Sequence, residues 1–339
     1  MKVAIIGLGF MGGMHAQIYK ALPGVELVAV ASLDVAGAKD KVAKLGLDAE
    51  VFDDFDTLLA NTDVDVIDIC LPTDLHAETA IKAANAGKHL FIEKPLSLTL
   101  ENCEAIQAAI SQGGVFSQVG HCIRFWPEYV ALKKFIDSGK AGALKSISLH
   151  RRAARPTYSQ YDWLNDETRS GGAAVDLHIH DADFIIHLFG LPNAVKSQAT
   201  RGRSGNDHIF THYQYADVTV HGEGGWDYPE HYGFSMAFEA IFENGSLSYD
   251  SASGKAPTVV LNDTPAMELE VIQPGPKQST IGEGNLSSLG GYYNELEYFI
   301  NCLTENMAPQ IATVAQATES LRVILAELKS AETGKVVQL

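Results

Sequence analysis

Short apolar runs and amphipathic segments alternate along the first 120 residues of the chain. Strands separated by helices of this length are typical of a parallel sheet with right-handed crossovers and helices on both faces. Six such strands predict a doubly wound nucleotide-binding domain over residues 1–121. The expected strands are 2–6, 26–32, 49–52, 64–71, 89–92 and 115–120, and the expected helices are 11–22, 35–46, 54–60, 75–87 and 100–112.

The pattern changes near Cys122, where strand-like segments begin to follow one another without helices between them. Asn244 and Gly245 separate two β-prone runs, which predicts a hairpin. Strands joined by hairpins form antiparallel sheets, so residues 122–339 are expected to form an α+β domain with a large, mainly antiparallel sheet. Helices are expected at 126–140, 173–190, 292–303 and 314–330, and strands at 144–150, in several segments up to about residue 271, and at the end of the chain.

Acidic residues outnumber basic residues, with 42 Asp plus Glu against 25 Lys plus Arg and a formal net charge of -17. This charge repels phosphate backbones and anionic lipid surfaces over most of the molecule. We therefore expect neither nucleic acid nor membrane as a partner. The basic cluster at 150–155 is the exception, and a local anion or sugar site explains it with fewer assumptions.

The four cysteines lie far apart and form no C-x-x-C pair, which favours neither a disulfide framework nor a zinc knuckle. The opening residues MKVAIIGLG lack the charged region and long apolar stretch of a secretory signal. No apolar run is long enough to cross a bilayer. We expect a reducing, cytoplasmic location.

The segment GLGFMG, from Gly7 to Gly12, follows the first expected strand and opens a helix. Glycines at positions 7, 9 and 12 allow a tight turn, close approach of the backbone to a pyrophosphate, and close packing of helix and strand. The amino terminus of the helix attracts phosphate. We therefore expect a dinucleotide to contact this loop, including Phe10 and Met11.

The end of the second strand bears on the choice of cofactor. NAD-preferring proteins usually place an acid there to hydrogen-bond the ribose 2′-hydroxyl. Ser32 occupies this position and is followed by Leu33 and Asp34. Serine does not repel a 2′-phosphate, but Leu33 offers no cation to hold one and Asp34 disfavours it. NAD and NADP both remain open, with NAD ahead.

Two further segments follow strands at the same edge of the sheet. Leu71 and Pro72 come directly after the fourth strand, and His76 lies in the first turn of the next helix, so we expect these residues to contact the cofactor. Glu93 and Lys94 come directly after the fifth strand, and we expect them to contact the cofactor as well. A lysine at that edge is either a solvated charge or an acid–base group.

The segment SGGAAVDLHIHDAD places Asp176 and His180 four residues apart, on one face of an expected helix. A carboxylate beside an imidazole orients the ring and raises its basicity, as a general base requires, although the pair also fits a structural role. Metal ligands are the alternative use of the histidines, but neither H-E-x-x-H nor a thiolate pair is present, so we expect no metal. The candidate ligands are His121, Asp176, His178, His180, Asp181 and His187.

Along most of its length the chain resembles the Gfo/Idh/MocA oxidoreductase family, which includes glucose–fructose oxidoreductase and inositol dehydrogenase. The resemblance rests on GLGFMGGMHA, on LPTDLHAE leading to EKP, on GHCIRFWPEY, on the G-G-x-x-x-D-x-x-x-H pattern at 171–180, and on the closing segment. Thr73 stands where asparagine is frequent in the family, and Ser32-Leu33 replaces the common Asp-Arg. The resemblance implies a Rossmann domain followed by a substrate-binding domain.

The resemblance also implies catalytic roles for Lys94, Asp176 and His180. In that case hydride passes between a nicotinamide cofactor and a secondary alcohol of a sugar, sugar derivative or inositol, and the Lys94–Pro95 peptide bond is cis. The family relationship further implies a homodimer or homotetramer formed through the antiparallel sheet. Candidate substrate contacts are Lys94, Arg124, Arg152, Arg155, Tyr158, Trp163, Asp176 and His180.

Two other classes of protein remain possible on these residues. One is a catalytically silent dinucleotide-binding sensor on the same fold, which would keep the glycine loop without the chemistry. The other, which we rank lower, is a metal-dependent hydrolase or lyase that uses the histidine-rich helix. The three residues Lys94, Asp176 and His180 favour the dehydrogenase over the sensor.

Overall fold

The computed structural model describes residues 1–273 and 289–339. These residues form two compact units, and each unit combines separate stretches of the chain. The first unit contains residues 1–122, 158–161 and 289–318, and the second contains residues 123–157, 162–273 and 319–339. The predicted domain ranges 1–121 and 122–339 differ from these units mainly because the helix at residues 290–304 belongs to the first unit.

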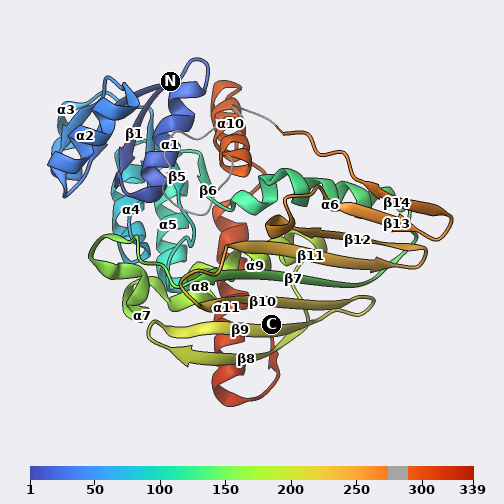
Figure 1. Cartoon of the computed structure of the whole chain (residues 1–339). Helices are drawn as coiled ribbons and strands as arrows, with labels where there is room; N and C mark the ends of the chain where they lie inside the picture. Colours follow the sequence, from blue (N-terminus) through green and yellow to red (C-terminus); the bar gives the residue numbers. More distant parts are fainter. Residues whose placement is uncertain (274–288) are drawn as a thin grey trace. The chain divides into compact units, whose positions relative to one another are not determined.

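The first unit contains a six-stranded sheet in the order β3-β2-β1-β4-β5-β6, and all of its neighbouring strands are parallel (Figure 1). The strand order reverses direction between β1 and β4, as in doubly wound sheets. Its elements are β1 (Lys2–Ile6), α1 (Phe10–Ala21), β2 (Glu26–Ala31), α2 (Val35–Leu45), β3 (Glu50–Phe52), α3 (Phe55–Asn61), β4 (Val66–Ile69), α4 (His76–Asn85), β5 (His89–Ile92), α5 (Leu100–Gly113), β6 (Ser117–Val119) and α10 (Gly290–Thr304).

Local sequence explains where several of these helices begin. The side chains of Asp34, Asp54 and Thr99 accept hydrogen bonds from backbone N–H groups in the first turns of α2, α3 and α5. Helices α4 and α5 pack against each other, and α1 packs against α10. Helix α10 therefore completes the first unit although more than 170 residues separate it from α5 in the sequence.

The second unit contains a nine-stranded sheet in the order β14-β13-β12-β11-β7-β10-β9-β8-β15. Strands β7 and β10 are parallel, and the other neighbours are antiparallel. Its strands are β7 (Leu144–Ala154), β8 (Ala194–Gly202), β9 (Gly205–Gln214), β10 (Thr219–Tyr228), β11 (Ser235–Phe242), β12 (Gly245–Asp250), β13 (Thr258–Leu261), β14 (Thr264–Glu268) and β15 (Val337–Gln338). Its helices are α6 (Pro127–Ser138), α7 (Glu167–Ser170), α8 (Gly172–Asp176), α9 (Ile179–Phe189) and most of α11 (Val314–Thr333).

Helices cover one face of this sheet. The Tyr129 ring on α6 contacts Phe184 on α9 and Phe238 on β11, with edge-on geometry in both contacts. Apolar side chains on the other face are partly exposed, including Phe210 and Ile241. The sheet therefore has one packed face and one face that carries apolar side chains in contact with solvent.

The predicted fold class is confirmed, with a six-stranded parallel Rossmann sheet and a mixed, mostly antiparallel second sheet. The predicted hairpin is present as β11 and β12. The prediction of one continuous helix over 173–190 is wrong, because α8 ends at Asp176 and α9 begins at Ile179. Among residues 1–273 and 289–339, helices fall short of the length and apolar character needed to cross a membrane.

Candidate cofactor and catalytic site

The glycine loop after β1 has the close approaches that its spacing predicts. Gly7 has a φ of +96°, and a Cβ there would lie 2.7 Å from the Cys70 carbonyl oxygen. A Cβ at Gly12 would lie 2.0 Å from the Gly7 carbonyl oxygen, so only glycine lets α1 pack this close to the loop. A Cβ at Gly9 would meet no described atom within 4 Å. The loop is thus tight on its inner side and open at Gly9.

The amino terminus of α1 fits a diphosphate group. Within the described part of the chain, the first turn contains no acidic residue, and the N-cap position, Gly9, supplies no side-chain hydrogen bond. The N–H groups in the first turn of a helix lack intrahelical acceptors and carry partial positive charge. Gly9, Phe10, Met11 and Gly12 can therefore hold the diphosphate of a dinucleotide through their backbone.

The residues after β2 have different environments from one another. The Asp34 side chain accepts a hydrogen bond from the Gly37 N–H at 2.9 Å and so caps α2. The Leu33 side chain is 83% exposed, and the Ser32 N–H donates to the Phe52 carbonyl. Asp34 caps the amino terminus of α2, so its position in the sequence can be explained without a hydrogen bond to the ribose of a cofactor.

Sequence reasoning missed Lys41, which lies in the middle of α2. Its ammonium group donates hydrogen bonds to the carbonyl oxygens of Leu8, at 3.2 Å, and Gly9, at 3.0 Å. It therefore places a positive charge beside the glycine loop. Its position in the sequence, in a helix with other lysines, carries no signal for this contact.

His76 joins two of the segments predicted to contact the cofactor. Its Nε2 lies 2.8 Å from the Leu71 carbonyl oxygen, and its Nδ1 lies 2.8 Å from the Pro95 carbonyl oxygen. Burial lowers the pKa of His76, although the two carbonyl groups oppose this shift. The imidazole thus ties the loop after β4, which also contains Pro72, to the loop after β5.

Lys94 follows β5 directly, and its peptide bond to Pro95 is cis, as the family resemblance implied. The side chain of Lys94 is partly exposed. Glu93 is buried, and its Oε2 accepts a hydrogen bond from the Lys94 backbone N–H at 3.0 Å. Glu93 therefore acts on the backbone of Lys94, and its predicted contact with the cofactor stays a prediction.

Phe10 and Tyr158 lie together in the first unit. Their ring centroids are 5.3 Å apart, and the ring planes are tilted by 46°. Tyr158 is 59% exposed. A residue predicted to bind cofactor therefore contacts one predicted to bind substrate, although they are almost 150 residues apart in the chain.

Asp176 and His180 lie in the second unit, at the end of α8 and in the first turn of α9. The His178 N–H between them donates to the Ala173 carbonyl oxygen, five residues back, instead of four. The side chain of His178 is buried, where its Nε2 lies 3.0 Å from the Tyr213 hydroxyl oxygen. Asp176 and His180 therefore do not lie four residues apart on one regular helix, as their spacing had predicted. Their catalytic pairing stays a prediction.

Two arginines predicted to bind substrate are held by carboxylates of the second unit. Arg124 is buried and donates two hydrogen bonds of 2.8 Å to Asp183. Arg152 donates two hydrogen bonds of 2.6 Å to Glu223. Burial opposes ionisation of Glu223, but hydrogen bonds from His208 and Arg152 lower its pKa to about 2.

Two further predicted substrate residues, Arg155 and Trp163, have contacts within the second unit. Arg155 donates to Asp207 at 2.6 Å and to Asn165 at 3.3 Å. Trp163 is partly buried and packs against a small apolar cluster that includes Trp226. Contacts of these residues with substrate stay predictions.

The histidine-rich segment has partners other than a metal. Arg151 donates two hydrogen bonds to the buried Asp181, at 3.0 and 3.1 Å. His178 Nε2 also lies 3.0 Å from a Glu327 oxygen. Burial and the nearby Arg124 lower the pKa of His187 to about 4. In residues 1–273 and 289–339, the candidate ligands named from the sequence do not come together as a group of three.

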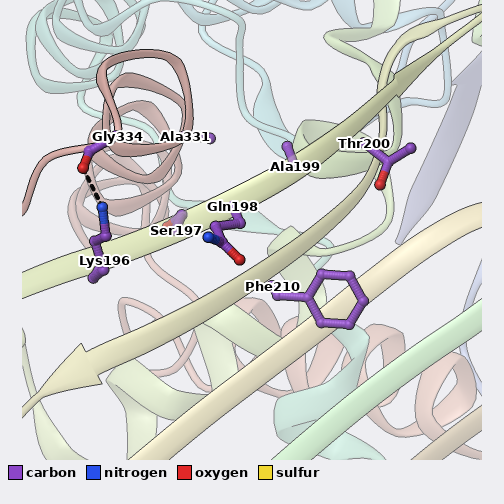
Figure 2. A pocket seen from close by; sticks show the side chains of 8 residues that line it. All are labelled: Lys196, Ser197, Gln198, Ala199, Thr200, Phe210, Ala331 and Gly334. Carbon is purple, nitrogen blue, oxygen red and sulfur yellow. Dashed lines mark hydrogen bonds between the residues drawn. The ribbon is translucent and has the colours of Figure 1, made fainter.

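The second unit also has a surface hollow of about 510 Å³ along β8 and β9 (Figure 2). Its lining includes Lys196, Gln198, Thr200 and Phe210, and the Lys196 ammonium donates to the Gly334 carbonyl oxygen. None of the residues predicted to bind cofactor or substrate lines this hollow. It is separate from the chemistry that the sequence indicates.

Two family models match the chain. Residues 1–121 match the model described as an oxidoreductase family with an NAD-binding Rossmann fold. Residues 129–248 match the C-terminal domain of the same GFO/IDH/MocA family. Both matched segments therefore point to one family, in the order that the sequence resemblance implied.

One related protein supports the same assignment over the full length of the chain, and a solved structure shares its fold. The scyllo-inositol 2-dehydrogenase (NAD(+)) of Bacillus subtilis is 28% identical over all of this chain and 96% of its own length. The 2,7-anhydro-N-acetylneuraminate hydratase of Mediterraneibacter gnavus is 29% identical over 68% of this chain and 63% of its own length. A solved levoglucosan dehydrogenase, in complex with NADH and levoglucosan, superposes with a TM-score of 0.85 at 22% identity, covering 100% of this chain and 99% of its own. The chain belongs to the Gfo/Idh/MocA oxidoreductase family.

Proposed function

We propose that the protein is a nicotinamide-dependent dehydrogenase that acts on a secondary alcohol of a sugar, sugar derivative or inositol. One observation carries the proposal. The glycine loop follows β1 and Lys94 follows β5, so both lie at the carboxyl edge of the same parallel sheet. Ligands of doubly wound sheets bind at this edge, beside the reversal of strand order. The names of the relatives support sugars and inositols as the substrate class.

In the proposed mechanism each of three residues has one role. His180 accepts the proton of the substrate hydroxyl group, and Asp176 orients its imidazole ring. Lys94 stabilises the negative charge that develops on the substrate oxygen. When bound, the nicotinamide ring supplies the hydride acceptor. Arg155, Tyr158 and Trp163 are the proposed polar and aromatic contacts for a hydroxyl-rich ring.

The proposed cofactor is NAD, with NADP as the alternative. Ser32 does not repel a 2′-phosphate, but Leu33 points an apolar side chain into solvent where an NADP-binding protein often has a cation. Lys41 lies beside the glycine loop and offers a positive charge to either dinucleotide. The two cofactors must therefore be compared directly.

The first experiment is an absorbance assay at the reduced-nicotinamide band, with NAD and NADP in parallel, against sugars, sugar acids and inositols. We expect Lys94→Ala to lower turnover by about 10² to 10⁴ while the fold is kept, because the variant loses the charge that stabilises the reacting oxygen. Lys82→Ala is the matched control, since Lys82 lies on α4 and pairs with Asp56 at the surface.

Turnover close to that of the unchanged protein in Lys94→Ala would refute the role of Lys94. Tight dinucleotide binding without turnover of any substrate would instead favour the sensor. The hydratase among the relatives shows why the panel should also include anhydro sugars.

A further inference from the structure

Four ionisable side chains are buried together in the interior of the first unit. They are His15 on α1, Asp68 on β4, Glu93 after β5 and Glu295 on α10, and each is at most 4% exposed. Buried charges are costly unless opposite charges and hydrogen bonds compensate them. The arrangement of these four groups therefore needs a physical reason.

The His15 ring lies between two carboxylates. Its Nδ1 is 2.8 Å from Asp68 Oδ2, and its Nε2 is 3.2 Å from Glu93 Oε1. Burial alone would lower the pKa of His15, but the charge of Asp68 and the nearby Cys70 raise it well above its usual value. The raised pKa favours the imidazolium form, which forms a hydrogen bond with Asp68 through Nδ1 and lies at ion-pair distance from Glu93 through Nε2.

The Glu93 carboxylate lies between this ring and the backbone of Lys94. Its Oε2 accepts the Lys94 N–H at 3.0 Å. A Cβ at Gly120 would lie 3.1 Å from Glu93 Oε1, so the neighbouring chain also confines the carboxylate. Burial opposes ionisation of Glu93, but His15 and Lys94 lower its pKa. A charged Glu93 thus connects His15 to the residue that carries the proposed chemistry.

Glu295 is the fourth member of the cluster, and its surroundings favour the protonated form. Burial and the charge of Glu93 raise its pKa well above the usual value. Atoms of His15, Glu93 and Glu295 lie within 4.8 Å of one another. These pKa directions favour one positive charge on His15 facing the charged carboxylates of Asp68 and Glu93.

We propose that His15 is a positioning residue for Lys94. Through its Nε2, His15 holds the Glu93 carboxylate, and Glu93 in turn fixes the Lys94 backbone. This inference rests on the proposed function, in which Lys94 acts on the substrate oxygen. His15 lies on α1, which begins at the glycine loop, so it connects α1 to the loop after β5 that contains Lys94. A small displacement of a reacting group is enough to slow an enzyme by about 10².

Two amide variants separate the two nitrogen atoms of the ring. The amide nitrogen of glutamine is as many bonds from Cα as Nε2 of histidine, so His15→Gln keeps a donor toward Glu93. The amide nitrogen of asparagine corresponds to Nδ1, so His15→Asn keeps the donor toward Asp68 and loses the one toward Glu93. Both variants remove the positive charge, so they form a matched pair.

The first readout needs no substrate. Lysine-selective 15N labelling reports hydrogen exchange at the Lys94 amide, whose signal is identified by its loss in Lys94→Arg. We expect exchange at least about tenfold faster in His15→Asn than in the unchanged protein, and within about threefold in His15→Gln. The Lys88 amide, which donates to the Ala83 carbonyl, is the internal reference and should not change.

The proposal would be overturned if exchange at the Lys94 amide changed equally in both variants or in neither. It would also be overturned if exchange at the Lys88 amide changed by the same factor, because the whole unit would then have become less stable. If both variants fail to fold, 15N shifts of the His15 ring in the unchanged protein decide the question. A ring with both nitrogens protonated above pH 7 supports the proposal, and a neutral ring or a tightly bound metal at His15 overturns it.

Turnover is the second readout and tests the proposed function separately. We expect kcat to fall about tenfold or more in His15→Asn, with the Kd for NADH within about threefold, because Lys94 is displaced and the glycine loop is kept. If the unchanged protein turns over no substrate but the exchange pattern appears, the proposed function fails and the link from His15 to Lys94 stands. If the unchanged protein turns over substrate but hydrogen exchange at the Lys94 amide is the same in both His15 variants as in the unchanged protein, only this inference fails.

Discussion

Lys41 shows how a single side chain can support a ligand loop from a distance in the sequence. Its ammonium group donates to the carbonyl oxygens of Leu8 and Gly9, in the loop that opens α1. Those contacts hold the loop and place a positive charge beside it. A hydrogen bond from a charged group contributes about 1.5 to 3 kcal/mol when it is well formed, so its loss should be measurable in binding.

We expect Lys41→Ala to raise the Kd for NADH by about fivefold to tenfold, because the loop loses both hydrogen bonds and the charge. Intrinsic fluorescence or calorimetric titration measures this change. Lys44→Ala is the control, since Lys44 lies on the same helix and pairs with Asp40 at the surface. Equal effects of the two substitutions would contradict a local role. A larger effect on NADPH than on NADH would show that Lys41 reads the 2′-phosphate.

At the scale of elements, the break between α8 and α9 depends on contacts with a strand. The side chain of His178 lies against Gly222 and Gly224 of β10. A Cβ at Gly224 would lie 2.7 Å from the His178 Cβ and 2.8 Å from its Nδ1. The two glycines therefore make room for the residue that separates Asp176 from His180.

We expect Gly224→Ala to destabilise the protein by about 1 to 3 kcal/mol, because the added methyl group overlaps His178. Turnover should fall as well, since His178 lies between the two proposed catalytic residues. Urea unfolding followed by circular dichroism measures the stability. Gly233→Ala is the control, since a Cβ there meets no described atom within 4 Å. Unchanged stability in Gly224→Ala would mean that this region repacks freely.

A cross-strand ion cluster joins β9 to β10. His208 Nδ1 lies 2.7 Å from Asp227 Oδ1, and its Nε2 lies 3.1 Å from Glu223 Oε1. Burial lowers the pKa of His208, but the hydrogen bonds and charges of these carboxylates outweigh burial and raise it. The folded protein therefore binds the His208 proton more tightly than the unfolded chain does.

The stability contributed by this proton is complete below the pKa of the unfolded chain, near 6.5, and is lost as pH rises through the higher pKa of the folded protein. We expect the difference in unfolding free energy between the unchanged protein and His208→Asn to be largest near pH 6 and to shrink by about 1 kcal/mol toward pH 9. Urea unfolding of both proteins across this range measures it. A difference that is independent of pH would assign the effect to packing.

At the scale of the whole molecule, the second sheet has partly exposed apolar side chains on one face. Ile241 is 47% exposed and Val260 is 42% exposed, and both pair with Ser246 of β12 between them. Exposed apolar rows of this kind favour association with a second surface. They agree with the homodimer or homotetramer that the family resemblance implied, which stays a prediction.

We expect sedimentation equilibrium to give a mass of two or four chains, and Ile241→Lys to shift the mass toward one chain, because a charge on this face cannot be buried against a copy of itself. Leu191→Lys is the control, since Leu191 is 45% exposed and lies outside the sheet. A mass of one chain for the unchanged protein would remove the prediction.

Much of the site could be predicted from the sequence because its parts are local. The glycine loop, the segment of His76 and the Lys94 loop each follow a strand directly, and parallel strands bring their carboxyl ends to one edge. The contacts of Lys41 and of Glu295 could not be predicted, because they join residues from separate elements. The helix break at His178 also escaped prediction, since its cause lies on β10.

By itself the sequence determined the alternation of strands and helices in the Rossmann domain, the hairpin of β11 and β12, and the family of the chain. Apolar periodicity and turn residues act over a few neighbours, so they can be read without the fold. Only the tertiary structure decided that α10 packs on α1, that Arg124 and Arg152 are held by carboxylates, and that His15 lies between Asp68 and Glu93. These features depend on which distant side chains share the interior, where a buried charge is stable only beside its partner.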